Sequence, residues 1–339
     1  MNYNNVPINW KNADRLITKS NRIALTTHEN PDGDGLGSEA GFYYHLLDIG
    51  KDVRIINYSP IPEDYNFLNK EKIFEKYDRK KHNTWLKGAD LIIIFDVGDF
   101  KRTGAMKDFI IDNSLVTLNI DHHPHPDSNL FHHNIVDLNA AATGCMVYDY
   151  LIEVREKPLT KKICDGIYTA VMTDTGCFRY SNTDKKCYDI AIESLKNGVK
   201  THKIYQHIYE NSSPEKINLL GLVLSEINYE FDGTFAWFDV TKEMMKKANA
   251  EPKDVDGFSD MARSIKGVEI SMMIMETSVD SCRINFRSKG KFTVNDLAKY
   301  LGGGGHAYAA GAKVEKNILS FKKDLFGSIR KLVEKKVGN

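Results

Sequence analysis

The most constraining feature of this sequence is a set of short apolar runs, each of which ends in acidic or imidazole residues. The runs read RIALTTH (22–28), LIIIFDVGD (91–99) and LVTLNIDHH (115–123). They are apolar without alternation, which is typical of parallel strands covered on both faces. A further strand-like run lies at 52–57, and helix-like segments lie at 35–50, 141–157 and 159–176. This arrangement predicts an α/β fold with a doubly wound, mainly parallel sheet.

The polar residues at the ends of these runs are of the types that bind metal ions. They are His28, Asp32, Asp34, Asp96, Asp121, His122 and His123, and the segment 159–176 adds Asp174 near its end. Because the carboxyl ends of parallel strands line one edge of a sheet, these residues are expected to converge. Carboxylates at such spacing repel one another unless a cation or a proton lies among them. The sequence therefore predicts a cation site at this edge.

The number of candidate ligands indicates two ions rather than one. Four carboxylates and two imidazoles are available, namely Asp32, Asp34, Asp96, Asp174, His28 and His122. Two ions that share one bridging carboxylate would use all of them. Oxygen and nitrogen ligands without thiolate favour Mn²⁺, with Mg²⁺, iron or Co²⁺ as substitutes. Paired ions of this kind are typical of hydrolysis at phosphorus.

The composition excludes several other classes of protein. Lysine plus arginine equals aspartate plus glutamate, 46 against 46, which argues against a protein that coats long nucleic acid. The five cysteines form no CxxC pair, which argues against a disulfide framework and fits a reducing compartment. The first residues do not resemble a signal peptide, and no apolar run approaches the ~20 residues of a membrane span. We expect a cytoplasmic protein.

The second half of the chain predicts a smaller α/β domain. We expect a first domain at 1–195, a linker with a connecting helix at 196–228, and a second domain at 229–339. Ser213 and Pro214 are expected to begin the connecting helix, and Thr143 to cap the helix at 141–157. Strands are expected at 234–240 and 281–290, followed by a helix that runs into a glycine-rich loop at 292–311.

Six segments, in this order, resemble the motifs of one known family. HENPDGD, FDVGD, NIDHH and MTDTG resemble the four motifs of the DHH phosphoesterases, and FRSKG and GGGGHAYAAG resemble the signatures of their DHH-associated C-terminal domain. The resemblance covers roughly residues 20 to 335. Among members of this family, the chain is most similar in size and make-up to the nano-RNases. Many of these hydrolases of short oligoribonucleotides also dephosphorylate 3′-phosphoadenosine 5′-phosphate.

The resemblance also implies roles for individual residues. One ion would be held by His28, Asp32 and Asp96, and the other by Asp34, Asp96, His122 and Asp174. His123 would face the scissile phosphate as a donor or acid, and Asp121 would orient the loop or a ligand histidine. The active site would lie in the cleft between the two domains. Its substrate-binding residues would be Arg287, Ser288, Gly303, Gly304, Gly305 and His306, with Arg102 and Arg179 as further candidates for phosphate contacts.

Several alternatives remain open at this stage. The expected reaction is hydrolysis of short oligoribonucleotides to mononucleotides, of 3′-phosphoadenosine 5′-phosphate to AMP, or of both. A cyclic di-AMP or linear dinucleotide phosphodiesterase would have the same active site, and a nucleotide-binding sensor without turnover is a third possibility. Inorganic pyrophosphatases share the first four motifs, but FRSKG and GGGGH argue against that activity. We expect no long nucleic acid and no membrane as partner, and a homodimer is conceivable.

Other polar residues near these motifs are interpreted as structural. His125, His132, His133, Asp127 and Asp137 are expected on the surface or in packing, because nothing in the sequence pairs them with carboxylates at ligand spacing. Cys177 is expected to be a small packed residue, since thiolate catalysis would need a paired base.

Overall fold

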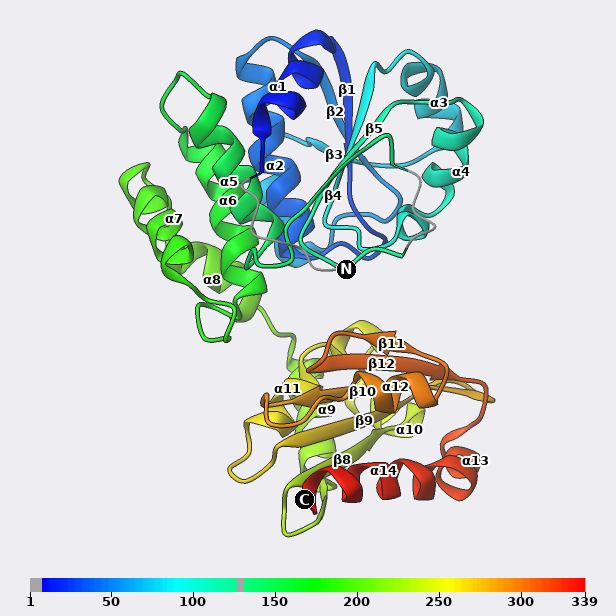
Figure 1. Ribbon diagram of the computed structural model, residues 1–339. Helices are drawn as coiled ribbons and strands as arrows, with labels where there is room; N and C mark the ends of the chain where they lie inside the picture. The colour runs from blue at the N-terminus through cyan, green and yellow to red at the C-terminus, as the bar shows by residue number, and fades with distance from the viewer. Residues whose placement is uncertain (1–7, 127–130, 339) are drawn as a thin grey trace. The chain divides into compact units, whose positions relative to one another are not determined.

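The computed structural model describes residues 8–126 and 131–338, so that Asp127 lies outside the described residues. The chain forms two compact units (Figure 1), the first ending at Asn211 and the second beginning at Ser212. This division falls inside the segment predicted as linker, 196–228. Helix α8 (Thr201–Tyr209) buries Ile204 in the core of the first unit, and helix α9 (Pro214–Ser225) packs in the second. Ser213 caps α9 as predicted, its side chain accepting the Lys216 backbone N–H.

The first unit is built around a six-stranded sheet in the order β3-β2-β1-β4-β5-β6. Its strands are β1 (Arg22–Thr26), β2 (Asp52–Asn57), β3 (Phe74–Lys76), β4 (Leu91–Phe95), β5 (Thr117–Asp121) and β6 (His133–Val136). Every neighbouring pair is parallel. The predicted parallel sheet is therefore confirmed, and the short outer strands β3 and β6 are additions that the sequence did not indicate.

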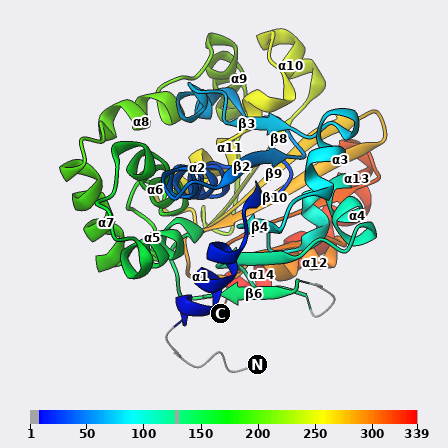
Figure 2. The same cartoon turned by 90° about the horizontal axis from the view of Figure 1, so that it is seen from above.

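Helices cover both faces of this sheet, as a doubly wound fold requires. On one face lie α1 (Trp10–Lys19), α2 (Gly33–Asp48), α5 (Thr143–Val154) and α6 (Lys161–Asp174), with α7 (Lys185–Lys196) beside them. On the other face lie α3 (Arg79–Lys87) and α4 (Ala105–Asp112), and Figure 2 shows this separation. Successive residues of β1 enter opposite cores, with Ile23 and Leu25 in one and Ala24 in the other. This explains why the strand is apolar without alternation.

The second unit contains a mixed six-stranded sheet in the order β11-β12-β10-β9-β8-β7. Its strands are β7 (Asn228–Glu230), β8 (Phe235–Val240), β9 (Ile270–Ser278), β10 (Ser281–Ser288), β11 (Gly304–Gly305) and β12 (Ala309–Val314). Among the described strands of this second sheet, the β8–β9 pair is parallel and the other neighbouring pairs are antiparallel. The predicted strands at 234–240 and 281–290 are confirmed as β8 and β10.

Helices also pack on both faces of the second sheet. One face is covered by α9, α10 (Lys242–Ala248) and α11 (Phe258–Ser264). The other is covered by α12 (Asn295–Tyr300), α13 (Ile318–Phe321) and α14 (Gly327–Val337), the last two joined by the π-helical turn η4 (Lys322–Phe326). Short 3₁₀ turns complete the described elements: η1 (Glu63–Asn69), η2 (Phe100–Thr103) and η3 (Pro252–Val255).

Two local predictions were wrong. Thr143 does not cap α5, because it is already the first helical residue and its backbone N–H binds Asp34 instead. The glycine-rich segment is not a loop throughout, since Gly304 and Gly305 form β11 and pair with Gly311 and Ala310 of β12. Within residues 8–126 and 131–338, none of the helices combines the length and hydropathy that crossing a bilayer would require.

Candidate active site

The loop between β1 and α2, together with the first turn of α2, brings His28, Asp32 and Asp34 to the carboxyl edge of the first sheet. Asp32 is the N-cap of α2, and its Oδ1 accepts hydrogen bonds from the backbone N–H groups of Asp34 and Gly35 at 3.0 and 3.3 Å. Its Oδ2 lies 3.6 Å from Nε2 of His28. One carboxylate therefore begins the helix and also faces the imidazole.

Asp96 follows β4 directly and lies between two imidazoles. Its Oδ2 is 3.7 Å from Nε2 of His28, and its Oδ1 is 3.6 Å from Nε2 of His122. The residue is 2% exposed and has a φ of 53°, in the left-handed region that an aspartate adopts only at some cost. This backbone conformation directs the carboxylate into the centre of the cluster.

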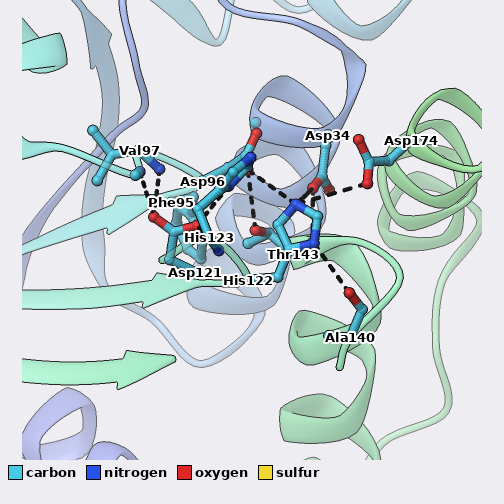
Figure 3. Close-up of polar contacts among 12 residues, drawn as sticks. Asp34, Phe95, Asp96, Val97, Asp121, His122, His123, Ala140, Thr143 and Asp174 are labelled. Atoms are coloured by element: carbon cyan, nitrogen blue, oxygen red, sulfur yellow. Dashed lines mark hydrogen bonds and ion pairs between the residues drawn. The ribbon is translucent and has the colours of Figure 1, made fainter. Parts of the chain in front are cut away.

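One ring nitrogen of His122 faces three carboxylates at ion-pair distance (Figure 3). Its Nε2 lies 3.6 Å from Asp34, 3.6 Å from Asp96 and 3.7 Å from Asp174. This buried atom has no hydrogen-bond partner among the residues that the structure describes. On the other side of the ring, Nδ1 lies 3.0 Å from the carbonyl oxygen of Ala140. Donation there leaves a lone pair on Nε2, which is the form of histidine that binds cations.

The carboxylates of this cluster are crowded. Burial, together with the charges of Asp96, Asp174 and Asp32, holds the pKa of Asp34 well above its usual range. Burial also raises the pKa of Asp174 to about 7; the charges of Asp96 and Asp32 add to this effect, and His122 opposes it. Asp34 is oriented by the backbone N–H groups of Thr143 and Gly144 at the start of α5, at 2.7 and 2.9 Å. Such crowding is relieved by a bound cation.

The geometry fits divalent cations. Three groups have ligand atoms within 4.8 Å of one another: His28, Asp32 and Asp96; Asp34, His122 and Asp174; and Asp96, His122 and His123. Ligand atoms held about 2.1 Å from an octahedral or tetrahedral ion are separated by roughly 3.0–3.5 Å. The spacings of 3.6–3.7 Å around His28 and His122 are close to that range. The six predicted ligands thus converge, and Asp96 contacts both sets.

Asp121 binds two histidines and the loop after β4. Its Oδ2 accepts the backbone N–H groups of Val97 and Gly98 at 2.8 and 2.6 Å, and its Oδ1 lies 2.9 Å from Nδ1 of His123. Burial opposes ionisation of Asp121, but its contacts with His123, His125 and Gly98 hold its pKa far below the usual range. Burial lowers the pKa of His123, but Asp121 and Asp96 outweigh this and raise it to about 11.

His125 was wrongly interpreted as having no carboxylate partner. Its Nε2 lies 2.9 Å from Oδ2 of Asp121, so that a single carboxylate serves both His123 and His125. The separation of four residues between Asp121 and His125 is the only signal in the sequence that could have indicated this pair. His132, in contrast, is exposed and contacts Thr117, and Asp137 accepts the backbone N–H of Asn139.

Arg102 contacts His28 on the side of the ring that faces away from Asp32 and Asp96. Its Nη2 is 3.0 Å from Nδ1 of His28, which is also 2.7 Å from the carbonyl oxygen of Glu29. One imidazole nitrogen cannot donate to the carbonyl and accept from the guanidinium at once. Donation to Glu29 leaves the Nε2 lone pair facing Asp32 and Asp96. Arg179 is exposed, and its Nε donates to the carbonyl oxygen of Gly176.

The second unit carries the remaining predicted residues. Arg287 lies on β10, with its Nε 3.6 Å from Asp260, and Ser288 is 1% exposed, accepting the backbone N–H of Gly290. His306 is exposed. Gly303 and Gly305 are required by the close approach of β12, because a Cβ would lie 2.1 Å from the carbonyl oxygen of Gly311 and 2.7 Å from that of Ala309. A Cβ on Gly304 would meet nothing within 4 Å.

Known proteins match both units. The DHH family N-terminal domain matches residues 22–171, and the DHHA1 domain matches residues 236–339. A curated relative from Thermus thermophilus, a bifunctional oligoribonuclease and PAP phosphatase, NrnA, is 31% identical over 304 residues, which is 89% of this chain and 87% of that protein. The chain belongs to the DHH family. It is therefore a metal-dependent phosphoesterase with a DHHA1 domain.

Further members of the DHH family support this assignment. The Bacillus subtilis protein with the same description is 26% identical, over 88% of this chain and 91% of its own length. The crystal structure of an exopolyphosphatase-related protein from Bacteroides fragilis has a TM-score of 0.91 at 28% identity and covers 97% of both chains. The similarity to this solved structure thus extends over nearly the whole chain.

Proposed function

We propose that this DHH protein uses two divalent cations, Mn²⁺ by preference, to hydrolyse short oligoribonucleotides, 3′-phosphoadenosine 5′-phosphate, or both. The observation that carries the proposal is Nε2 of His122, which has no hydrogen-bond partner in the described part of the chain and faces Asp34, Asp96 and Asp174 at 3.6–3.7 Å. The substrate class is supported by the NrnA relatives, which align with most of this chain.

The proposed ligand sets share Asp96. His28, Asp32 and Asp96 would hold one cation, and Asp34, Asp96, His122 and Asp174 the other. When bound, the cations would supply Lewis acidity at the phosphate and a nucleophilic water at neutral pH. The absence of thiolate from the set favours Mn²⁺ over softer metals, with Mg²⁺ or Co²⁺ as substitutes.

The protein's own groups would then act on the substrate phosphate. Asp121 accepts the Nδ1–H of His123 and so fixes the orientation of the ring. A charged His123, consistent with its raised pKa of about 11, would donate a hydrogen bond where negative charge develops on the phosphate. Arg287, Ser288, His306 and the glycines of the second unit would bind the nucleotide. The location of the active site between the two domains, the cytoplasm as compartment and a homodimer all stay predictions.

A cyclic di-AMP or linear dinucleotide phosphodiesterase is the second candidate, because the same cation site would serve that reaction. A sensor without turnover is less well supported, since none of the six ligand residues is missing from the cluster.

Product analysis on a substrate panel tests the proposal. The full-length protein is incubated with Mn²⁺ and dinucleotides to pentanucleotides, 3′-phosphoadenosine 5′-phosphate or cyclic di-AMP. We expect mononucleotides from the oligomers, AMP from the bisphosphate, and no turnover with a chelator. Asp96→Asn should lower activity roughly a hundredfold or more, because both ligand sets lose a charge. No turnover of any substrate by the parent, or parent activity in Asp96→Asn, would contradict the proposal.

A further inference from the structure

Glu39 is a buried carboxyl that the proposed mechanism does not use. It lies on α2, five residues after Asp34, and is 0% exposed. Its Oε2 accepts a hydrogen bond from Nδ2 of Asn57 at 2.8 Å, whereas its Oε1 has no hydrogen-bond partner in the described part of the chain. A buried polar atom without a partner destabilises a fold. Apart from the hydrogen bond to Asn57, the contacts of the described residues give no reason for a carboxyl at this position.

The one contact of Glu39 determines how Asn57 is oriented. Asn57 ends β2 and is 3% exposed, and its Oδ1 accepts from the Thr27 backbone N–H at 3.1 Å and from the Thr26 hydroxyl at 3.3 Å. An amide group can rotate by half a turn and exchange its donor and acceptor ends. An acceptor at the position of Glu39 favours the orientation in which Oδ1 faces Thr27.

Thr27 is in turn held from both neighbouring strands. Its backbone N–H binds Asn57 from β2, and its hydroxyl donates to the carbonyl oxygen of Phe95, the last residue of β4, at 2.8 Å. Thr27 is followed in the sequence by His28, and Phe95 is followed by Asp96. The hydrogen bonds that begin at Glu39 thus reach, across three adjacent strands, the two positions whose side chains approach to 3.7 Å in the candidate cation site.

We propose that Glu39 is a positioning residue of the cation site: through Asn57 it holds Thr27, and thereby sets the separation of His28 and Asp96. This inference rests on the proposed function, since it concerns the same cations. Glu39 contacts neither ligand residue, so its effect is on how tightly the cation is bound and not on the chemistry at phosphorus.

Calorimetric titration of the metal-free, full-length protein with Mn²⁺ tests the inference without measuring activity. Glu39→Met removes the acceptor, and we expect the dissociation constant of the site that contains His28 to rise about tenfold, as for other residues that orient metal ligands. Glu39→Gln keeps an acceptor for Asn57 and should stay within about twofold of the parent. The matched control is Leu46→Ala, a cavity about two helical turns further along α2, which should lower Tm but leave Mn²⁺ affinity unchanged.

The route through Asn57 is tested by a double-mutant cycle. Asn57→Ala should weaken Mn²⁺ binding as much as Glu39→Met does, and the double variant no further, because both remove one chain of contacts. Additive losses, parent affinity in Glu39→Met, or an equal loss in Leu46→Ala would overturn the inference. If Glu39→Met does not fold, Asn57→Ala with parent affinity overturns it as well. A parent protein that binds no Mn²⁺ would instead defeat the proposed function.

Discussion

At the scale of single residues, the two histidines on Asp121 offer a direct separation of roles. His123 lies 3.1 Å from Asp96 as well as 2.9 Å from Asp121, whereas His125 contacts the other oxygen of Asp121. Both rings hold the same carboxylate, but only His123 contacts a residue of the proposed ligand set. A substitution at each position therefore distinguishes an effect on phosphate chemistry from an effect on the orientation of Asp121.

We predict that His123→Ala lowers kcat roughly 10²- to 10³-fold, the scale for losing one donor to a developing oxyanion. Bound manganese, measured by elemental analysis, should stay at the parent level. His125→Ala is the matched control and should lower kcat much less, because Asp121 keeps its bonds to Val97, Gly98 and His123. Equal rates for the two variants would remove His123 from the mechanism.

The sequence indicated most of these residues because each lies where an apolar strand or a helix ends. Asp96 and His122 could be predicted in this way, since the carboxyl ends of parallel strands meet at one edge of the sheet. The contacts of Asp34 with the backbone of Thr143 and Gly144, and that of Glu39 with Asn57, could not. Asp34 is 109 and 110 residues from Thr143 and Gly144, and it binds their backbone N–H groups, which every residue type except proline offers. Glu39 and Asn57 are 18 residues apart and meet in the core. Neither kind of contact leaves a pattern in the sequence.

At the scale of single elements, Gly303, which precedes β11, and Gly304, its first residue, have different steric requirements. We predict that Gly303→Ala destabilises the protein by about 1–3 kcal/mol, the usual cost of inserting a methyl group into a packed region. Its Cβ would lie 2.1 Å from the carbonyl oxygen of Gly311. Gly304→Ala should be neutral, because nothing lies within 4 Å of its Cβ. Denaturant unfolding measures the stability of both variants, and equal stabilities would contradict the close approach of Gly303 to β12.

The carboxyl end of α2 contains a histidine that should make the fold sensitive to acid. Burial, aided by the charge of Arg155 and opposed by Asp48, lowers the pKa of His45 to about 4. The residue is 3% exposed. Because its folded pKa lies below the unfolded value of about 6.5, the unfolded state binds the proton more tightly. Its contribution to stability is therefore complete above pH 6.5 and is lost as the pH falls towards 4.

We predict that the free energy of unfolding loses about 3 kcal/mol through His45 between pH 7 and pH 4. The glutamine in His45→Gln does not titrate, so the free energy of unfolding of this variant should fall by about 3 kcal/mol less than that of the parent between pH 7 and pH 4. Denaturant titrations of both proteins at a series of pH values provide the comparison. Parallel pH profiles would show that folding does not lower the pKa of His45.

Four inner strands of the first sheet could be predicted, and the elements that were missed are short or polar. β1, β2, β4 and β5 are apolar and lie in the interior of the sheet. β3 has three residues and β6 four, and both are at edges, where few side chains are fully buried. Five helices of the first unit also went unpredicted, namely α1, α3, α4, α7 and α8. α3, RKKHNTWLK, buries only His82 and Leu86, which is too few apolar positions for a clear period.

At the scale of the whole molecule, bound cations should stabilise the first unit. Mn²⁺ at one hundred times its dissociation constant adds about 3 kcal/mol to the free energy of unfolding for each occupied site. Trp237→Phe leaves Trp10 and Trp85, both in the first unit, as the remaining tryptophans. We predict that their fluorescence shifts to a higher denaturant midpoint with Mn²⁺, and that Asp96→Asn abolishes the shift. A shift that persists in Asp96→Asn would mean that manganese binds elsewhere.

The two units each have a sheet with helices on both faces, and the sequence predicted the larger architecture better than the division between the units. After residue 196 the sequence turns polar and the alternation of strand-like and helix-like runs stops, which predicted a linker, but α8 continues the first unit to Asn211. A polar segment can still be helical when one residue, here Ile204, enters a core. The packing of Ile204 depends on core residues that are far from it in the sequence, so the segment 201–209 alone does not indicate it.

The positive φ of Asp96 determines which substitutions there can be interpreted. A β-branched or bulky residue would have to leave the left-handed region, and the turn that orders Val97 and Gly98 would move with it. Asparagine tolerates that region and matches aspartate in shape, so it removes the charge and little else. At this position, a loss of activity in an alanine or valine mutant mixes misfolding with chemistry, and only the isosteric amide tells the two apart.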